Sequence, residues 1–65
     1  MVIINGEPAP GAAGMTLRGY LETEGYRADA VVVEQNLVIV PRDRLSEVTI
    51  SDGDTIEILC FVGGG

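Results

Sequence analysis

The fold is decided by the stretch DGDTIEILCFVGGG, which runs from Asp52 to Gly65. Its first three residues predict a turn, because glycine adopts backbone angles that other residues avoid and aspartate side chains can hydrogen-bond back to the main chain. Residues 55–62 alternate and are rich in β-branched and apolar side chains, which predicts a buried strand. This is the longest and most apolar strand of the chain, so we expect it at the centre of the sheet.

Three glycines, Gly63, Gly64 and Gly65, follow this strand with no polar spacer. Glycine loses more conformational freedom on ordering than any other residue, so packing does not explain its presence here. The pattern predicts a flexible tail of residues 63–65 that enters a narrow channel of another protein, with a reach of about 10 Å. The alternative is a disordered end without a function.

The Gly65 carboxylate is the candidate reactive group. A chain-terminal carboxyl has a pKa of about 3.3–3.7, so at neutral pH it is an anion and a poor electrophile that must first gain a good leaving group such as adenylate. The chain contains no GxxxxGK[ST] phosphate-binding loop. We therefore expect no cofactor on the chain itself and the use of ATP by a partner enzyme.

The composition indicates one small domain, residues 1–62, with an acidic surface. The chain has 65 residues, ten of them acidic and four basic, and a net charge of −6. This charge argues against a nucleic-acid partner and favours a partner with a basic face. The single cysteine and the lack of a signal peptide or of about 18–20 consecutive apolar residues predict a cytoplasmic protein without a membrane span. With no histidine, no catalytic or metal-binding residue can be assigned.

Local patterns predict the other elements. The apolar segment 1–4 is followed by Asn5-Gly6, which is typical of a two-residue hairpin turn with positive φ at both positions. The return segment 7–12 contains two prolines, which place it at a sheet edge. Apolar residues at helical spacing predict a helix over 16–24, with Thr16 as N-cap and Gly25 at its end. Two further strands, 30–34 and 37–40, are expected on either side of a turn at Gln35-Asn36. One helix against a mixed sheet of four to five strands is an α+β roll.

This order of elements, β-β-α-β-β, resembles the ubiquitin-like β-grasp sulfur carriers, and within them the ThiS-type carriers of thiamine biosynthesis. The motifs that carry the resemblance are Asn5-Gly6, Val40-Pro41-Arg42, Asp52-Gly53-Asp54 and the glycine end after Val62. The resemblance implies that an E1-like adenylyltransferase adenylates Gly65 and that a persulfide from a cysteine desulfurase or another donor converts it to a thiocarboxylate. It also implies that the thiocarboxylate gives its sulfur to thiazole synthase, and that the chain is a monomeric protein co-substrate rather than an enzyme.

Two other functions fit the same pattern. The small subunit of molybdopterin synthase shares the fold, the diglycine end and the thiocarboxylate, but that family is usually longer. An RNA- or ligand-binding β-grasp module would continue past the last strand and normally carry basic residues, so the net charge of −6 counts against it.

Strand alternation also predicts a docking surface. If Glu57 faces solvent, Leu59 and Phe61 share its face, whereas Ile56, Ile58 and Cys60 point into the core, with Cys60 acting as a small buried hydrophobe.

On the strand 30–34, an outward Glu34 places Val32 outward as well. If the two strands are neighbours, Val32, Leu59 and Phe61 form an exposed apolar patch, and such patches on small proteins often mark interaction sites. The alternative is that the loop 42–47 covers Leu59 or Phe61.

Overall fold

The C-terminal strand lies at the centre of a five-stranded mixed sheet in the order β2-β1-β5-β3-β4, as the sequence predicted. The computed structural model describes residues 1–61. The tail Gly63, Gly64 and Gly65 lies outside the described residues, so its flexibility and the domain boundary after residue 62 stay predictions. The elements are β1 (Ile3–Ile4), β2 (Glu7–Pro8), α1 (Leu17–Thr23), η1 (Ala28–Ala30), β3 (Val31–Gln35), β4 (Val38–Val40), η2 (Arg42–Arg44) and β5 (Thr55–Cys60).

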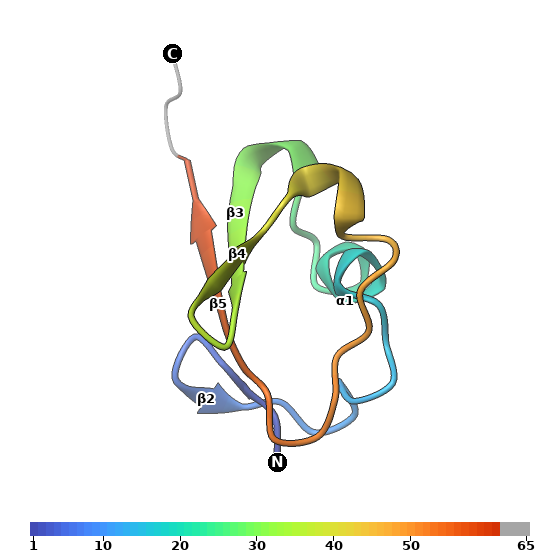
Figure 1. Cartoon of the computed structure of the whole chain (residues 1–65), viewed down its shortest axis with the longest axis vertical. Helices are drawn as coiled ribbons and strands as arrows, with labels where there is room; N and C mark the ends of the chain where they lie inside the picture. Colours follow the sequence, from blue (N-terminus) through green and yellow to red (C-terminus); the bar gives the residue numbers. More distant parts are fainter. Residues whose placement is uncertain (62–65) are drawn as a thin grey trace.

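The helix α1 packs against one face of the sheet, which makes the fold α+β (Figure 1). β1 pairs in parallel with β5, and the other neighbouring strands are antiparallel. Leu17 and Leu21 of the helix are buried with Val33, Ile56 and Ile58 of the sheet in one hydrophobic core. The opposite face of the sheet is therefore free to carry the side chains that alternate with these core residues.

The predicted turns and caps at the first hairpin and the helix are confirmed. Asn5 and Gly6 have φ of 52° and 82°, as a two-residue hairpin turn between β1 and β2 requires. Thr16 is the N-cap of α1 and accepts a hydrogen bond from the Gly19 N–H at 3.0 Å. A side chain at position 19 would begin 3.0 Å from the Thr16 hydroxyl, so glycine allows the cap to approach closely. Gly25, with φ of 84°, ends the helix.

The turn between β3 and β4 lies one residue later than predicted. Gln35 belongs to β3, where it is opposite Ile56 of β5, and the turn residues are Asn36 and Leu37, with φ of 53° and 72°. The sequence pattern did not show why Gln35 stays in the strand. Its side-chain Nε2 donates to Asp54 at 2.8 Å, a contact that needs the extended backbone of β3.

Asp54 joins the β3–β4 hairpin to the turn that precedes β5. As a whole residue Asp54 is only 9% exposed. Its Oδ2 accepts hydrogen bonds from the Ser51 N–H at 2.9 Å and from Gln35, and its Oδ1 accepts one from Asn36 Nδ2 at 3.0 Å. Asn36 in turn accepts a hydrogen bond from the Thr55 N–H at 2.9 Å. The bond from Ser51, and then those from Asn36 and Gln35, hold the pKa of Asp54 below its ordinary value of 3.8.

This lowered pKa predicts a pH-dependent contribution of Asp54 to stability. The ionised carboxylate stabilises the folded chain at pH values above 3.8, and this stabilisation is lost as the pH falls through the lower pKa of the folded state. At pH 7 we expect Asp54→Asn to reduce the free energy of unfolding by about 1–3 kcal/mol, because an amide cannot accept all three bonds. Urea unfolding of both proteins between about pH 2 and pH 7 measures this difference, which should shrink at the acid end. The exposed Asp43→Asn is the control, and an equal loss in that variant would contradict the role of Asp54.

Candidate functional site

The face of the sheet opposite α1 carries the predicted docking residues. β3 and β5 are antiparallel neighbours, and Val32 lies directly opposite Leu59. Leu59 and Phe61 are 49% and 60% exposed, so the segment 42–47 does not cover them, and Val32 is half-buried. The Phe61 N–H donates to the Ala30 carbonyl at 3.0 Å, which holds Phe61 beside the start of β3. The structure thus brings the three side chains together on one exposed face, whereas their role in docking stays a prediction.

A fourth apolar side chain, Ile39 of β4, extends this face. Ile39 is opposite Glu34, so it projects on the same side of the sheet as Val32, and it is 61% exposed. We call Val32, Ile39, Leu59 and Phe61 the outer-face patch. Ile39 was not predicted, because residues 37–40 are all apolar and their sequence does not show which of them face outward; the pairing of Ile39 with Glu34 decides it.

The prediction that Cys60 is a buried core residue is wrong. Cys60 has the same phase as Ile58, but it is exposed. The core cluster reaches only Ile58 on β5, and Cys60 is the last residue of that strand, beyond the layer that covers this face. Strand alternation correctly predicted the face of the sheet on which Cys60 lies. Burial of Cys60 would also require another element to cover this end of β5.

The predicted reactive end follows the described part of the chain. Gly63, Gly64 and Gly65, the residues predicted to enter a partner and to be modified, lie outside the described residues. The last described residue is Phe61, a member of the outer-face patch, and it directly follows β5. By sequence, only Val62 separates Phe61 from Gly63.

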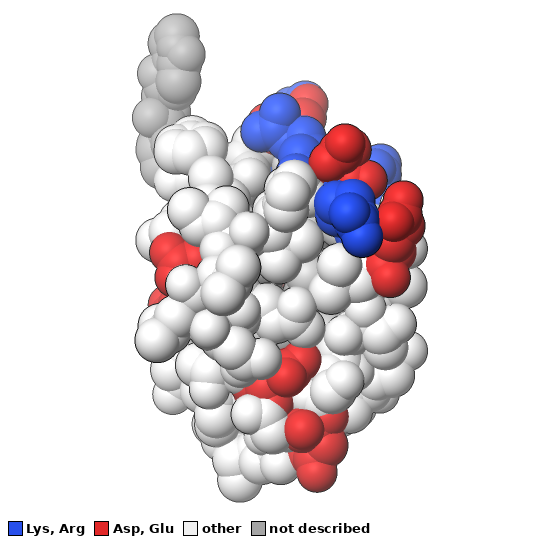
Figure 2. Space-filling view, in the orientation of Figure 1, with Lys and Arg blue, Asp and Glu red and all other residues white. Residues whose placement is uncertain are grey.

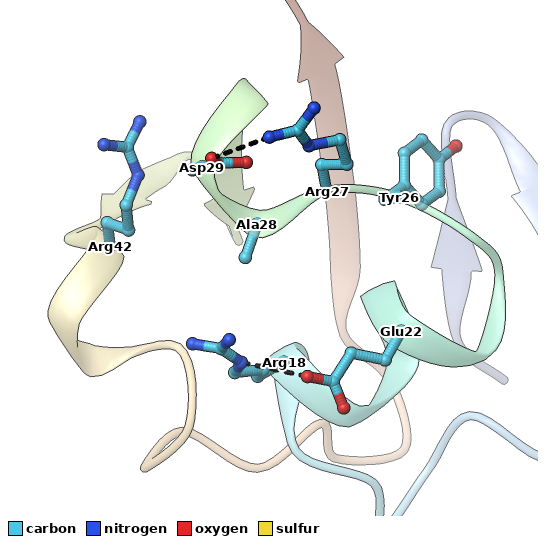
Figure 3. Close-up of a pocket in the computed structure, with 7 residues that line it drawn as sticks. All are labelled: Arg18, Glu22, Tyr26, Arg27, Ala28, Asp29 and Arg42. Carbon is cyan, nitrogen blue, oxygen red and sulfur yellow. Dashed lines mark hydrogen bonds and ion pairs between the residues drawn. The ribbon is translucent and has the colours of Figure 1, made fainter.

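Three of the four arginines lie elsewhere, around a surface hollow of about 420 Å³ between α1, η1 and η2 (Figure 3). Its lining residues are Arg18, Glu22, Tyr26, Arg27, Ala28, Asp29 and Arg42. Arg18 pairs with Glu22, and Arg27 pairs with Asp29, each at 3.1 Å. Figure 2 shows the basic side chains gathered with acidic ones at this end of the molecule. Two of the three cations are thus neutralised by neighbours, and no residue of the predicted site lines this hollow.

Residues 1–61 offer neither a cluster of metal-binding side chains nor a membrane-spanning helix. No group of three or more His, Cys, Asp and Glu side chains in this part of the chain is arranged to hold a metal ion. No helix in the same range has the length and hydropathy needed to cross a membrane.

Within residues 1–61, the sheet order, its single parallel pair and the one α-helix on the covered face define the ubiquitin-like β-grasp class. The expected fold class is confirmed. A family model described as the ThiS family matches residues 2–65, including the glycine end. The chain belongs to the ThiS family.

Individual relatives agree with this assignment. The chain is 40% identical over 50 residues to the sulfur carrier protein ThiS of Bacillus subtilis, covering 77% of this chain and 76% of that one. The crystal structure of thiamine biosynthesis protein ThiS from Geobacter metallireducens superposes with a TM-score of 0.78 at 31% identity, over 98% of this chain and 97% of that one. A thiazole synthase of Paramagnetospirillum magneticum is 42% identical over 64 residues, which are 98% of this chain. The chain spans only 20% of that relative's length.

Proposed function

We propose that this chain is a sulfur carrier protein of thiamine biosynthesis, whose Gly65 carboxylate is converted to a thiocarboxylate. The observation that carries the proposal is the family match, which runs from the first strand through all three glycines. The relative from B. subtilis that bears the name of a sulfur carrier supports the same function. In this proposal the chain is a co-substrate and partner enzymes supply the catalysis.

The proposed chemistry requires activation of a carboxylate. An E1-like adenylyltransferase uses ATP to place an adenylate on the Gly65 carboxyl, because the free anion is a poor electrophile. A persulfide from a cysteine desulfurase or another donor then attacks the activated carbonyl, AMP leaves, and an acyl disulfide forms. A second thiol of the partner system attacks the donor sulfur of this acyl disulfide, so that the thiocarboxylate leaves and the donor and the thiol are joined in a new disulfide. Glycine suits this position, since it has no side chain to hinder entry into a narrow active site.

Thiazole synthase is the proposed sulfur acceptor. Its support is a relative named thiazole synthase, in which a segment similar to nearly this whole chain is part of a longer polypeptide. Such a segment is close to the rest of that protein at a high effective concentration. The cytoplasmic location and the monomeric state expected from the sequence stay predictions.

The function is tested by the intact mass of the chain after incubation with the E1-like enzyme, ATP, a persulfide source and a thiol reductant that cleaves the acyl disulfide. Replacement of one oxygen by sulfur at a terminal carboxylate adds about 16 Da. Omission of ATP is the control, and it should leave the mass unchanged. A chain whose mass does not change in the complete mixture would contradict the carrier function.

The outer-face patch is the proposed docking surface of these partners, since exposed apolar patches on small proteins often mark interaction sites. Its aromatic member is the natural anchor, because desolvated aromatic side chains often dominate interface energies. We expect Phe61→Asp to weaken association with the adenylyltransferase by about 2 kcal/mol or more, roughly 30-fold in Kd. Isothermal titration calorimetry measures the affinity.

Circular dichroism provides the control for this variant. Phe61 is 60% exposed and outside the core cluster, so the thermal midpoint of Phe61→Asp should stay close to that of the wild type. A second control, Leu37→Asp, changes a more exposed apolar residue at the β3–β4 turn, outside the outer-face patch. Equal losses of affinity in both variants would mean that added negative charge, and not the loss of Phe61, weakens binding.

A further inference from the structure

Two acidic residues lie directly opposite each other in the middle of the outer face. Glu34 of β3 and Glu57 of β5 are register partners, and Ile39 of β4 is the next residue in the same row. Val32 and Leu59 form the neighbouring row, two residues along each strand. Both glutamates are half-buried as whole residues. The two glutamates thus have the apolar side chains of Ile39, Val32 and Leu59 as neighbours on the outer face.

No cation of the chain neutralises this pair in the structure. The ion pairs found among residues 1–61 use the amino terminus, Arg18, Arg27 and Arg44, and none of them involves Glu34 or Glu57. The fourth arginine, Arg42, lines the hollow on the helix side of the molecule. Residues 62–65 are valine and glycine and carry no cationic side chain.

This arrangement is unfavourable in the free chain. Like charges directly opposite on neighbouring strands destabilise a sheet. A cationic group from another molecule, placed over the pair, would remove the repulsion and gain two attractive contacts. The apolar side chains around the pair would exclude water from these contacts and strengthen them.

We propose that Glu34 and Glu57 together bind a lysine or arginine side chain of the adenylyltransferase, and that apolar side chains next to this cation contact Leu59 and Ile39. The inference rests on the proposed function, since it specifies the chemistry of the partner surface that meets the outer-face patch. Charge complementarity identifies the occupant: the row offers two carboxylates and no cation, so a second acidic surface is repelled.

The test combines the stability of the free chain with its affinity for the partner. In the double variant E34Q/E57Q the repulsion is removed, so we expect the thermal midpoint of the free chain to rise by about 1–8 °C. The same variant should bind the adenylyltransferase about tenfold more weakly, because the cation loses both carboxylates. The wild-type affinity should also fall more steeply with added NaCl than that of the variant.

The matched control is the double variant E7Q/E24Q, which makes the same change in net charge away from the outer face. Glu7 lies on β2 opposite Ile4, whose side chain is in the core, and Glu24 is the C-cap of α1. This control should keep the wild-type affinity to within about twofold, which separates a local contact from long-range attraction of an acidic protein to a basic one.

The outcomes separate this inference from the proposed function. A wild-type chain that the adenylyltransferase does not adenylate would overturn both. If the wild type is adenylated and E34Q/E57Q binds as tightly as E7Q/E24Q, only the inference is overturned. A lower thermal midpoint in E34Q/E57Q would also overturn it, because the pair would then stabilise the free chain. Higher stability together with the specific loss of affinity is the expected result.

Discussion

Deletion of Gly65 is expected to slow thiocarboxylate formation by about 100-fold or more while the thermal midpoint of the chain stays unchanged. The deletion leaves Gly64 at the end, chemically still a glycine carboxylate, but about 3.5 Å short of the original position. A displacement of even about 1 Å can cost on the order of 100-fold in rate when a group must align for attack. Single-turnover formation of the adenylate, followed by mass spectrometry of the product, measures the effect.

Gly64→Val tests whether the bulk of the tail, and not only its length, affects its entry into the partner's active site. The substitution keeps the full length of the tail, but a β-branched side chain restricts the backbone and obstructs a narrow channel, so we expect a loss of similar size. Neither change touches a residue of the core cluster, and circular dichroism should give the wild-type thermal midpoint. Normal adenylation of the Gly65 deletion would mean that the glycine end has no role in activation, and the carrier function would be contradicted.

Ile56→Ala is expected to have the largest effect on stability. Ile56 is 0% exposed and lies on the central strand, opposite Ile4 on one side and Gln35 on the other. Truncation of a buried isoleucine to alanine typically costs about 2–5 kcal/mol, because the lost burial adds to the energy of the cavity. A domain of this size has about 3–10 kcal/mol of stability in total, so the variant should lose at least about 8 °C in its thermal midpoint and can be unfolded at 37 °C.

Leu59→Ala is the matched control for this prediction. It shortens a side chain of similar size on the same strand, but on the exposed face. We expect a loss of less than about 1 kcal/mol in the free energy of unfolding, together with weaker binding to the adenylyltransferase. Equal destabilisation by the two variants would mean that the outer face is as well packed as the core, contrary to the exposure of Leu59.

Several features of the fold could be predicted from the sequence because they depend on a few neighbouring residues. Asn5-Gly6 requires only the backbone freedom of its own two positions, and both have the expected positive φ. Thr16 and Gly25 limit the helix through contacts within one turn of each end. The central place of β5 followed from its length and apolar content, and the family resemblance followed from the order of these motifs.

The outer face shows where local patterns were insufficient. Alternation correctly placed Leu59 and Phe61 on the side opposite Ile58, but it also placed Cys60 in a core that does not extend so far. Burial depends on the elements that cover a strand, and the sequence of that strand does not contain this information.

Register was the second property that required the tertiary structure. The pairing of β3 with β4 adds Ile39 to the outer-face patch, and the pairing of β3 with β5 brings Glu34 opposite Glu57. The same pairing keeps Gln35 in the strand, within hydrogen-bonding distance of Asp54, which is 19 residues away in the chain. Contacts between residues so far apart form only when the whole sheet assembles, because turn geometry and the burial of one face together select the register.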